Sequence, residues 1–489
     1  MRIEFTWLGI GCLALACCAS DSPVGKSGLM VNDARFGKPT AIVAGAGEQL
    51  GWHASSVGDL DADGIDDFVI YGEPSGGFLT PEADQALYGH LYLFYGRERF
   101  PEKLSSADAD AVLGGEILHS GPAGDVNGDG KADLLISGVN WAQFIFGSSR
   151  RLQGQIEVAQ VGVRWLGPTR SGQPLLGQRS LRVVRAGDVN GDGLGDLLAG
   201  VAAEDAPAGQ DPDGLIRKFL ILGRKDGWPA GLFQASWAQA MFDVARTEPD
   251  GQTTVSEIAT PLGDIDGDGY ADVSAIDSHR ADRIFYGGPD RFKGILGSAE
   301  ADAILDHGGS GLAPIGDVDG DGCDDLATRG TDARSGIPYP ISVVYSPSTR
   351  WSGAATTMRG LQISMPVDPQ WNSGADIMDI RGADVDQDGR HDILLAAPDA
   401  SELYLIRGTG ERRVGSYRLQ ASELLMRGVN FTTTTGQREG DALGSTIDVD
   451  GDLDGNGGPD VLAGAPGQTS TEFTGGSVYV IPGSGPRPF

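Results

Sequence analysis

A nine-residue acidic pattern occurs seven times in the 489-residue chain and constrains its fold more than any other feature. Each copy has Asp or Asn at positions 1, 3, 5 and 9 and glycine at position 6. The intervals between successive copies are 53 to 76 residues, and the copies begin at Asp59, Asp125, Asp188, Asp264, Asp317, Asp384 and Asp452. A pattern with such a period indicates a repeat architecture in which each copy belongs to one structural unit.

The spacing of the acidic side chains favours a bound cation. Two carboxylates ~4 Å apart repel each other by about 1 kcal/mol in water and about 4 kcal/mol at an effective dielectric of 20. A tight loop that turns several of them inward is therefore unstable without a positive ion. Side-chain oxygens at positions 1, 3, 5 and 9, with the backbone carbonyl of position 7, suit Ca²⁺ better than Mg²⁺, which requires a strict octahedron. The absence of His and Cys side-chain ligands disfavours zinc.

Repetition separates this interpretation from a solvated Asx turn, which remains an alternative for a single copy. Of the 28 side-chain positions in the seven loops, 25 are Asp and three are Asn, and position 6 is always glycine. The sequence therefore predicts about seven calcium sites. The predicted ligands are Asp59, Asp61, Asp63, Ile65, Asp67, Asp125, Asn127, Asp129, Lys131, Asp133, Asp188, Asn190, Asp192, Leu194, Asp196, Asp264, Asp266, Asp268, Tyr270, Asp272, Asp317, Asp319, Asp321, Cys323, Asp325, Asp384, Asp386, Asp388, Arg390, Asp392, Asp452, Asp454, Asn456, Gly458 and Asp460.

An EF-hand is excluded by the residues on the C-terminal side of each loop. EF-hand loops place a bidentate Glu at position 12 and lead into a helix. Here no copy has Glu at position 12, and the loop leads into a short apolar run such as 68–70 or 461–463, which is typical of a strand.

The apolar runs between the loops predict the architecture. Each loop is followed by a second run, for example 91–96, 219–223 or 403–408, and each unit holds about four strands. Seven antiparallel four-stranded units cannot bury their faces alone, whereas radial stacking covers both faces of each unit. The prediction is an all-β chain that forms a seven-bladed β-propeller.

The chain resembles the FG-GAP, or VCBS-type, repeats that build the N-terminal propeller of integrin α subunits. Phe-Gly before the loop and Gly-Ala-Pro after the next strand give that family its name. The seventh unit comes near it with Leu443-Gly444 and Gly464-Ala465-Pro466, while other units depart from these flanks. The resemblance runs from about residue 40 to the end and implies calcium in the loops. It implies no particular partner, because the ligand-contacting features of integrins have no match here.

The chain ends predict how the ring closes. The seventh unit stops after its third strand at 478–481, and residues 40–51 resemble the fourth-strand stretch of other units, such as 109–121. We therefore expect Thr40 to Ala44 to complete the last blade. The predicted domains are a signal peptide (1–16), a flexible tether (17–39) and the propeller (40–489).

The N-terminal segment resembles a targeting sequence. Arg2 precedes a short apolar stretch, and Ala14-Leu15-Ala16-Cys17 resembles a bacterial lipobox in which Cys17 becomes the acylated N-terminus. This predicts a lipid-anchored protein of the bacterial cell envelope, and the alternative is secretory cleavage near Ala19. Because only Cys323 lies in the predicted propeller, no disulfide is expected within it.

Composition and motifs leave two classes of function open. The formal charge of −31 includes the 25 loop aspartates, and seven Ca²⁺ ions would bring it to about −17, without a basic stripe for nucleic acid. No nucleophile or zinc-protease motif is present, and six His are scattered among the units. In the pairs Asp66-Asp67 and Asp324-Asp325, the first member is interpreted as a solvated neighbour of the ligand.

The first hypothesis is a monomeric, non-enzymatic adhesion or recognition module for a protein or glycan. The alternative is a propeller-type polysaccharide lyase or other carbohydrate-active enzyme. Long connections between the second and third strands, at 72–89 and 201–217, predict partner binding on the face away from the metal loops, near Phe78 and Tyr88.

Overall fold

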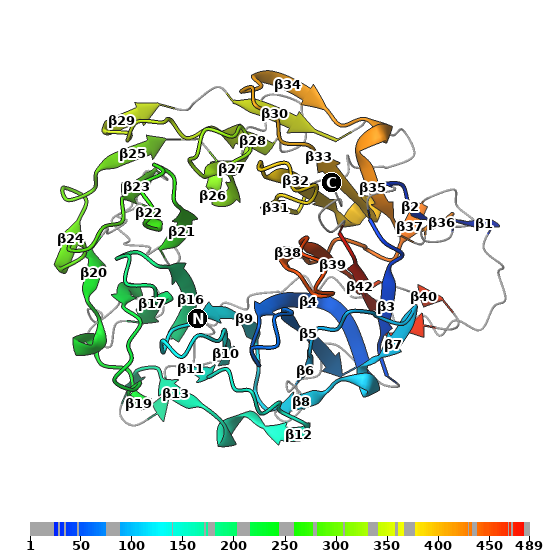
Figure 1. Ribbon diagram of the computed structural model, residues 1–489, viewed down its shortest axis with the longest axis horizontal. Helices are drawn as coiled ribbons and strands as arrows, with labels where there is room; N and C mark the ends of the chain where they lie inside the picture. Colours follow the sequence, from blue (N-terminus) through cyan, green and yellow to red (C-terminus); the bar gives the residue numbers. More distant parts are fainter. Residues whose placement is uncertain are drawn as a thin grey trace, which may run out of the picture.

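Seven five-stranded β-sheets are arranged radially around a central axis in the computed structural model (Figure 1). The prediction of an all-β, seven-bladed propeller is confirmed. The structure describes residues 24–27, 30–33, 36–45, 48–74, 89–138, 140–170, 173–174, 181–202, 216–243, 259–276, 281–306, 309–330, 341–356, 360–365, 377–428, 430–432, 438–467, 469–470 and 473–483.

The blades are numbered by the order of their metal loops, and each metal loop joins the first strand of its blade to the second. The first strands surround the axis (Figure 1) and are, from blade 1 to blade 7, β4 (Glu48–Gly58), β9 (His119–Gly124), β16 (Leu181–Gly187), β21 (Thr260–Gly263), β26 (Gly309–Gly316), β31 (Asp379–Ala383) and β38 (Ile447–Gly451). The second strands are β5 (Asp67–Pro74), β10 (Asp133–Gly138), β17 (Asp196–Ala202), β22 (Asp272–Ile276), β27 (Asp325–Gly330), β32 (Asp392–Ala397) and β39 (Asp460–Ala465).

Outward from these lie the third and fourth strands. The third strands are β6 (His90–Phe94), β11 (Trp141–Ile145), β18 (Ile216–Ile221), β23 (Asp282–Phe285), β28 (Ile341–Val344), β33 (Glu402–Ile406) and β42 (Ser477–Ile481). The fourth strands are β8 (Ala111–Gly114), β13 (Val163–Leu166), β20 (Ala240–Asp243), β25 (Ala303–Asp306), β30 (Leu361–Ser364), β35 (Leu424–Arg427) and β3 (Thr40–Val43).

A fifth strand, which the sequence analysis did not foresee, closes the outer edge of every blade. In the same blade order these strands are β12 (Gly154–Glu157), β19 (Gly231–Leu232), β24 (Gly294–Gly297), β29 (Gly353–Thr356), β34 (Gly415–Arg418), β2 (Met30–Val31) and β7 (Lys103–Ser105). Six of them come from the link between the third and fourth strands of the next blade and pair in parallel with the fourth strand, as β12 does with β8. The estimate of about four strands per unit was too low because these segments have only two to four residues and no apolar run long enough to indicate a strand.

The remaining described elements are small. A three-stranded sheet contains β1 (Val24–Ser27), β36 (Asn430–Thr432) and β37 (Arg438–Gly440), and two hairpins are formed by β14 (Thr169–Arg170) with β15 (Gln173–Pro174) and by β40 (Thr469–Ser470) with β41 (Phe473–Thr474). Short 3-10 helices are η1 (Ser106–Asp108), η2 (Val158–Gln160), η4 (Ala235–Trp237), η5 (Pro398–Ala400) and η6 (Ala421–Glu423). Among the described residues, no helix is long and apolar enough to cross a membrane.

The hydrophobic core lies between neighbouring blades. Leu91 and Leu93 of β6 share one buried cluster with Leu134 and Ile136 of β10. Strands β10, β32 and β39 are buried at every position, as are β11, β33 and β42. Because other blades cover both faces of these strands, their sequences are continuous apolar runs rather than alternating ones.

The N-terminal strand β3 and the C-terminal strand β42 pair in blade 7. Strand β3 runs antiparallel to β42, with Thr40 opposite Val480 and Val43 opposite Ser477. Strand β2, which precedes β3, lies antiparallel to β35 of blade 6, with Met30 opposite Arg427. At the other blades, the fifth strand comes from the link between the third and fourth strands of the next blade. At blade 6, the N-terminal segment supplies this strand, β2, instead.

Some predictions fall on parts of the chain outside the described residues. These are the signal peptide with Cys17, most of the connection from 72 to 89 with Phe78 and Tyr88, and most of the connection from 201 to 217.

Candidate metal centres

All seven metal loops share one backbone conformation. Positions 4 and 6 are left-handed in every loop: φ at position 4 ranges from 57° at Gln387 to 75° at Gly128, and φ at position 6 from 82° to 89°. In loops 1 to 6 a Cβ at position 6 would meet nothing within 4 Å, so this backbone conformation, rather than crowding, explains the glycines there. The sequence analysis recognised only position 6, although position 4 is also glycine in five loops.

Hydrogen bonds from the loop backbone orient the side chains at positions 1 and 5. The carboxylate at position 1 accepts the N–H of the position 6 glycine at 2.8 Å in all seven loops and the N–H of position 5 at 3.0–3.2 Å. The side chain at position 5 accepts the N–H of position 7 at 2.8–3.1 Å. Each bond uses one lone pair and leaves others on the same oxygens for a cation.

The aspartate at position 9 is the most buried of the acidic side chains in each loop, with at most 2% exposure. It starts the second strand, and its Oδ1 accepts the N–H of a residue beyond the third strand, such as Gly147 for Asp133, at 2.6–2.9 Å. In six loops its Oδ2 accepts the N–H of position 2. This carboxylate therefore joins the metal loop to the third strand.

Burial raises the pKa of all seven position 9 carboxyls, and the neighbouring loop carboxylates raise the pKa further. The pKa rises to about 8 at Asp67, Asp272, Asp325 and Asp460, to about 7 at Asp133 and Asp196, and to about 6 at Asp392. Asp392 has the smallest rise because the Arg407 guanidinium contacts it. A cation beside these groups would favour their ionised forms.

Five loops bring three carboxylate oxygens within 4.8 Å of one another. Ligands on opposite sides of an ion with bonds of about 2.3–2.6 Å are separated by about 5 Å, so this spacing fits an oxygen-coordinated cation. The five groups are Asp59, Asp61 and Asp67; Asp264, Asp266 and Asp272; Asp317, Asp319 and Asp325; Asp384, Asp386 and Asp388; and Asp452, Asp454 and Asp460. Loops 2 and 3 have Asn127 and Asn190 at position 3 and so hold one carboxylate fewer.

Arginines from neighbouring blades contact three of the loops. Arg151 of blade 2 bridges Asp61 and Asp63 of loop 1 and lies over the Tyr95 ring at 4.7 Å from its centroid. Arg350 and Arg412 repeat this arrangement on loops 4 and 5, over Tyr286 and Tyr345. The three guanidiniums therefore connect adjacent blades through the metal loops.

The arginine contacts occur at the loops that have the most carboxylates at their ligand positions. Loops 1, 4, 5 and 6 have Asp at all four side-chain positions, and each contacts an arginine, which in loop 6 is Arg407. Loops 2, 3 and 7 contain one Asn each, and among the described residues no arginine forms an ion pair with their aspartates, although Lys131 of loop 2 pairs with Asp129 at 3.6 Å. Loop 6 has a second ion pair, from its own Arg390 to Asp388. The bridging arginines therefore occur at loops with four carboxylates at the ligand positions, where they offset part of the negative charge.

Backbone hydrogen bonds connect the loops around the axis. The N–H of position 8 donates to the position 1 carbonyl of the preceding loop at 2.7–3.0 Å, as Ala132 does to Asp59 and Asp66 does to Asp452. Six of the seven junctions have this bond. The exception lies between loops 6 and 7, where position 8 is Pro459 and has no N–H.

The interpretation of Asp66 and Asp324 as solvated neighbours was wrong. Both are at position 8 and partly buried, and their Oδ2 atoms accept the N–H groups of Asp452 and Asp264 in the preceding loops at 3.0 and 2.9 Å. They add a side-chain bond to the same blade junctions. Cys323 at position 7 is buried, which raises the pKa of its thiol to about 12, so the thiol stays protonated.

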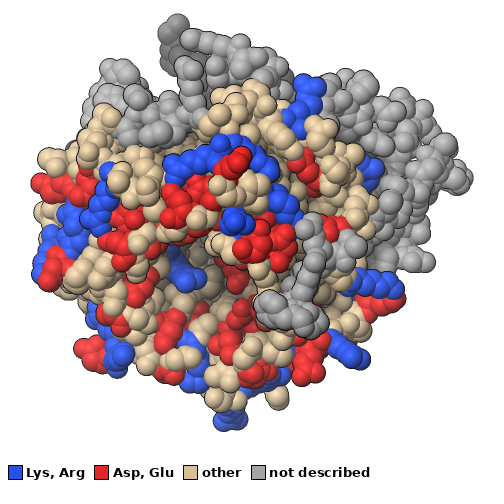
Figure 2. Space-filling view, turned by 45° about the horizontal axis from the view of Figure 1, so that its top comes forward, with Lys and Arg blue, Asp and Glu red and all other residues tan. Residues whose placement is uncertain are grey.

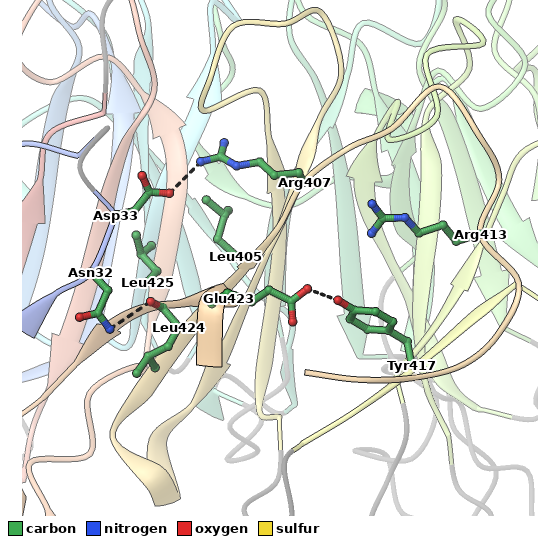
Figure 3. A pocket seen from close by; sticks show the side chains of 10 residues that line it. Asn32, Asp33, Leu405, Arg407, Arg413, Tyr417, Glu423, Leu424 and Leu425 are labelled. Carbon is green, nitrogen blue, oxygen red and sulfur yellow. Dashed lines mark hydrogen bonds and ion pairs between the residues drawn. The ribbon is translucent and has the colours of Figure 1, made fainter. Parts of the chain in front are cut away.

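Two of the cavities lined by described residues lie outside the loops. The larger, of about 550 Å³, forms where the N-terminal segment lies against blade 6 (Figure 3). Asp33 pairs there with Arg407 at 3.0 Å, and Arg413 points into the cavity from the opposite side (Figure 3). The other, of about 430 Å³, lies in the central channel and brings together His53 and His119, which sequence reasoning treated as scattered.

No family model matches the chain. Similar solved structures include BBS1N in complex with ARL6DN, with 12% identity, a TM-score of 0.43, and coverage of 94% of this chain and 97% of that one. The rhamnogalacturonan lyase YesW has 12% identity, a TM-score of 0.37, and coverage of 95% and 75%. An Agrocybe aegerita lectin that recognises non-reducing terminal N-acetylglucosamine has 13% identity, a TM-score of 0.39, and coverage of 94% and 100%. Likenesses at this level do not distinguish between functions.

Proposed function

We propose that the protein is a calcium-stabilised propeller of the FG-GAP type that acts as a non-enzymatic recognition module for a protein or glycan. The observation that carries the proposal is the common geometry of the seven loops, each with oxygen ligands already oriented by backbone N–H groups. The ion holds adjacent blades together, because each loop is hydrogen-bonded to at least one neighbouring loop and to the residue that follows the third strand of its own blade.

Calcium is the ion that this donor set favours. The side-chain donors are carboxylate and amide oxygens, and the irregular loop does not impose a strict octahedron. Asp59, Asp61, Asp63 and Asp67 would hold the ion in loop 1, with the backbone carbonyl of Ile65, and the equivalent residues would do so in the other loops. Its positive charge would offset the repulsion among three or four carboxylates.

The recognition role is supported by the connections that the scaffold carries. The second strand of blade 1 ends at Pro74 and the third begins at His90, while the equivalent gap in blade 3 runs from Ala202 to Ile216. Blade 2 needs only two residues between Gly138 and Trp141. Long connections on a rigid scaffold are frequent binding elements.

A metal count combined with thermal unfolding tests the calcium proposal. We expect close to seven bound Ca²⁺ per chain by elemental analysis after dialysis, and a melting temperature lowered by well over ten degrees in EDTA. A ligand that binds only the native state stabilises it by about 2.7 kcal/mol per site at a hundredfold excess over Kd. Asp129→Ala should remove one ion, whereas Asp226→Ala, an exposed aspartate outside the loops, should remove none. An unchanged melting curve in EDTA would refute the proposal.

The alternative function is a carbohydrate-active enzyme, and the observation in its favour is the imidazole and guanidinium groups in the central channel. A glycan array and a polysaccharide depolymerisation assay on the same calcium-loaded protein separate the two. Glycan binding without new chain ends supports recognition, and release of new reducing or unsaturated ends supports the enzyme.

We also propose that Cys17 carries a lipid anchor to the bacterial cell envelope. The lipobox-like Ala14-Leu15-Ala16-Cys17 supports this. Incorporation of labelled palmitate into the wild-type protein but not into Cys17→Ser would bear it out, and a mature N-terminus near Ala19 would contradict it.

A further inference from the structure

The central channel contains a cavity of about 430 Å³ that is lined from five of the seven first strands, β4, β9, β16, β21 and β31. The face drawn in Figure 2 is hollowed near its centre, with basic side chains visible in the hollow. Cavities of this size hold small molecules in other proteins.

Four of the five basic side chains that line the cavity come from blades 1 to 3, and the fifth is Arg381 of blade 6. His53, His119 and Arg182 line it, and each stands six residues before the first aspartate of its metal loop. At about 3.3 Å per residue, these side chains are up to ~20 Å from the metal loops along the strands. In blades 5 to 7 the equivalent residues are Gly311, Met378 and Thr446, which carry no charge. Apart from Arg381, the basic side chains of the cavity therefore come from three adjacent blades, and they are separate from the metal centres.

Two arginines of the cavity have no acidic partner in the part of the chain that the structure describes. Arg182 and Arg185 on β16 are exposed to the channel, and among the described residues neither forms an ion pair. Arg381, on β31, is paired with Asp379 at 2.7 Å. The arginines at the metal loops are likewise held by carboxylates. Arg182 and Arg185 are thus available to a ligand. Each planar guanidinium group can donate two hydrogen bonds to one carboxylate.

The two histidines supply neutral polar groups. Nε2 of His53 donates to the carbonyl oxygen of Ser120 at 2.8 Å, which leaves Nδ1 as an acceptor. Burial lowers the pKa of His53, and so does Arg381; burial also lowers the pKa of His119, together with Arg182 and His53. Neutral imidazoles next to a serine hydroxyl suit ligand hydroxyl groups, which both donate and accept.

We propose that this cavity binds a small hydroxylated organic acid, of which a uronic acid unit of a glycan is the fitting class. Arg182 and Arg185 bind the carboxylate, and His53, His119 and Ser120 bind hydroxyl groups. Val183 and Pro261 give the cavity apolar surface for the C–H face of a sugar ring. This proposal rests on the proposed recognition function and names a ligand class for it.

Calorimetric titration of the calcium-loaded protein with glucuronate, glucose and inorganic sulfate tests the proposal. Glucuronate and glucose differ in the carboxylate, and sulfate presents an oxyanion without hydroxylated carbon. We expect glucuronate to bind at least tenfold more tightly than either. Binding of sulfate as tight as that of glucuronate would overturn the uronate assignment, and no heat from glucuronate up to 10 mM, on the order of the weakest specific affinities, would overturn the site.

Variants locate the binding. Arg182→Gln with Arg185→Gln should weaken glucuronate binding at least tenfold, whereas Arg418→Ala, an exposed arginine on the outer strand β34, should leave it unchanged. Circular dichroism and the calcium count of each variant show whether it is folded. If the double variant is folded and binds as the wild type does, the assignment is wrong. Failure of the calcium proposal would appear separately, as melting that does not respond to EDTA.

Discussion

Arg151, in the link that follows β11 of blade 2, contacts the carboxylate of Asp61 in the metal loop of blade 1. Asp61 is almost fully buried, while the arginine is partly exposed and stacked on Tyr95. The contact places a fixed positive charge beside a loop with four carboxylates. Metal affinity and blade-to-blade contact are therefore coupled at this point.

Removing that charge should have opposite effects on the metal-free and metal-bound protein. We expect Arg151→Ala to destabilise the protein in EDTA by about 1 kcal/mol, because a partly buried ion pair is lost. The same change should raise the calcium affinity of loop 1 on the order of tenfold, since a nearby charge no longer repels the divalent ion. The readout is a wider gap between melting temperatures in EDTA and in calcium. Arg150→Ala is the matched control, because its exposed side chain contacts no loop carboxylate; an equal effect of both variants would exclude a specific role for Arg151.

The left-handed residue at position 4 predicts a substitution that stabilises the protein. Ala62 adopts φ 61° where five other loops have glycine. A non-glycine residue in the left-handed region destabilises the folded state by about 1–2 kcal/mol. Glycine removes this strain, but it loses more conformational entropy on folding, which costs about 0.5–1 kcal/mol. Ala62→Gly should therefore stabilise the protein by up to about 1 kcal/mol in chemical denaturation. The reverse change in loop 2, Gly128→Ala, should be destabilising, and a loss of stability for Ala62→Gly would contradict this explanation.

Substitutions at positions 5 and 9 of a metal loop should have different effects. A change at position 5 should mainly weaken metal binding, whereas a change at position 9 should also destabilise the metal-free fold. Asp133 accepts backbone N–H groups on both oxygens, from Gly147 at 2.8 Å and Val126 at 2.9 Å. An amide at this position presents an NH₂ group to one of those donors, so Asp133→Asn should cost about 1–3 kcal/mol even in EDTA. Asp129→Ala should instead lower stability mainly when calcium is present. Denaturant titrations of both variants, with and without EDTA, give the comparison; equal losses in EDTA would remove the distinction.

Asp448 on β38 predicts a pH dependence of stability. Burial raises its pKa to about 6, with a further rise from Asp450, and the Ser55 hydroxyl, the Asp450 N–H and Arg381 act in the opposite direction. A raised carboxyl pKa means that the folded state favours the proton. The contribution of this group is therefore complete below about pH 4 and is lost as the pH rises through about 6.

Asp448→Asn removes that loss. Relative to the wild type, the variant should be more stable at pH 8 than at pH 4 by about 1 kcal/mol, reduced from the ~2.7 kcal/mol of two pKa units because the side chain is partly exposed. The difference between the two proteins isolates this residue, since the metal loops titrate in both. A difference that does not change between pH 4 and pH 8 would rule the contribution out.

Much of the fold was predictable because its main determinant is local and repeated. The order of Asp, Asn and Gly in nine residues defines each loop without distant contacts, and the apolar runs after the loops are strands buried on both faces. The fifth strands were not predictable, since a segment such as Lys103–Ser105 has no apolar pattern and is held by a fourth strand of another blade. The contacts of Arg151 and the approach of His53 to Ser120 likewise depend on how blades are placed beside each other. One feature of the sequence could have indicated the bridging arginines. In each blade whose metal loop has one, a tyrosine directly follows the third strand: Tyr95, Tyr286 or Tyr345.

The N-terminal segment predicts the outcome of two truncations. Strand β3 supplies the fourth strand of blade 7, and β2 covers the outer edge of blade 6. Deletion through Ala46 should uncover the edges of β42 and β35, where unpaired N–H and C=O groups favour aggregation. It also removes the partner of β7, which pairs with β3 from Ala41 to Val43. Deletion through Gly28 keeps both strands, although it removes β1, so its melting temperature should remain within a few degrees of the full chain. Light scattering and thermal unfolding of the two proteins, both in calcium, make the comparison. If the shorter protein melts as the longer one does and stays monomeric, the N-terminal strand does not hold the ring closed.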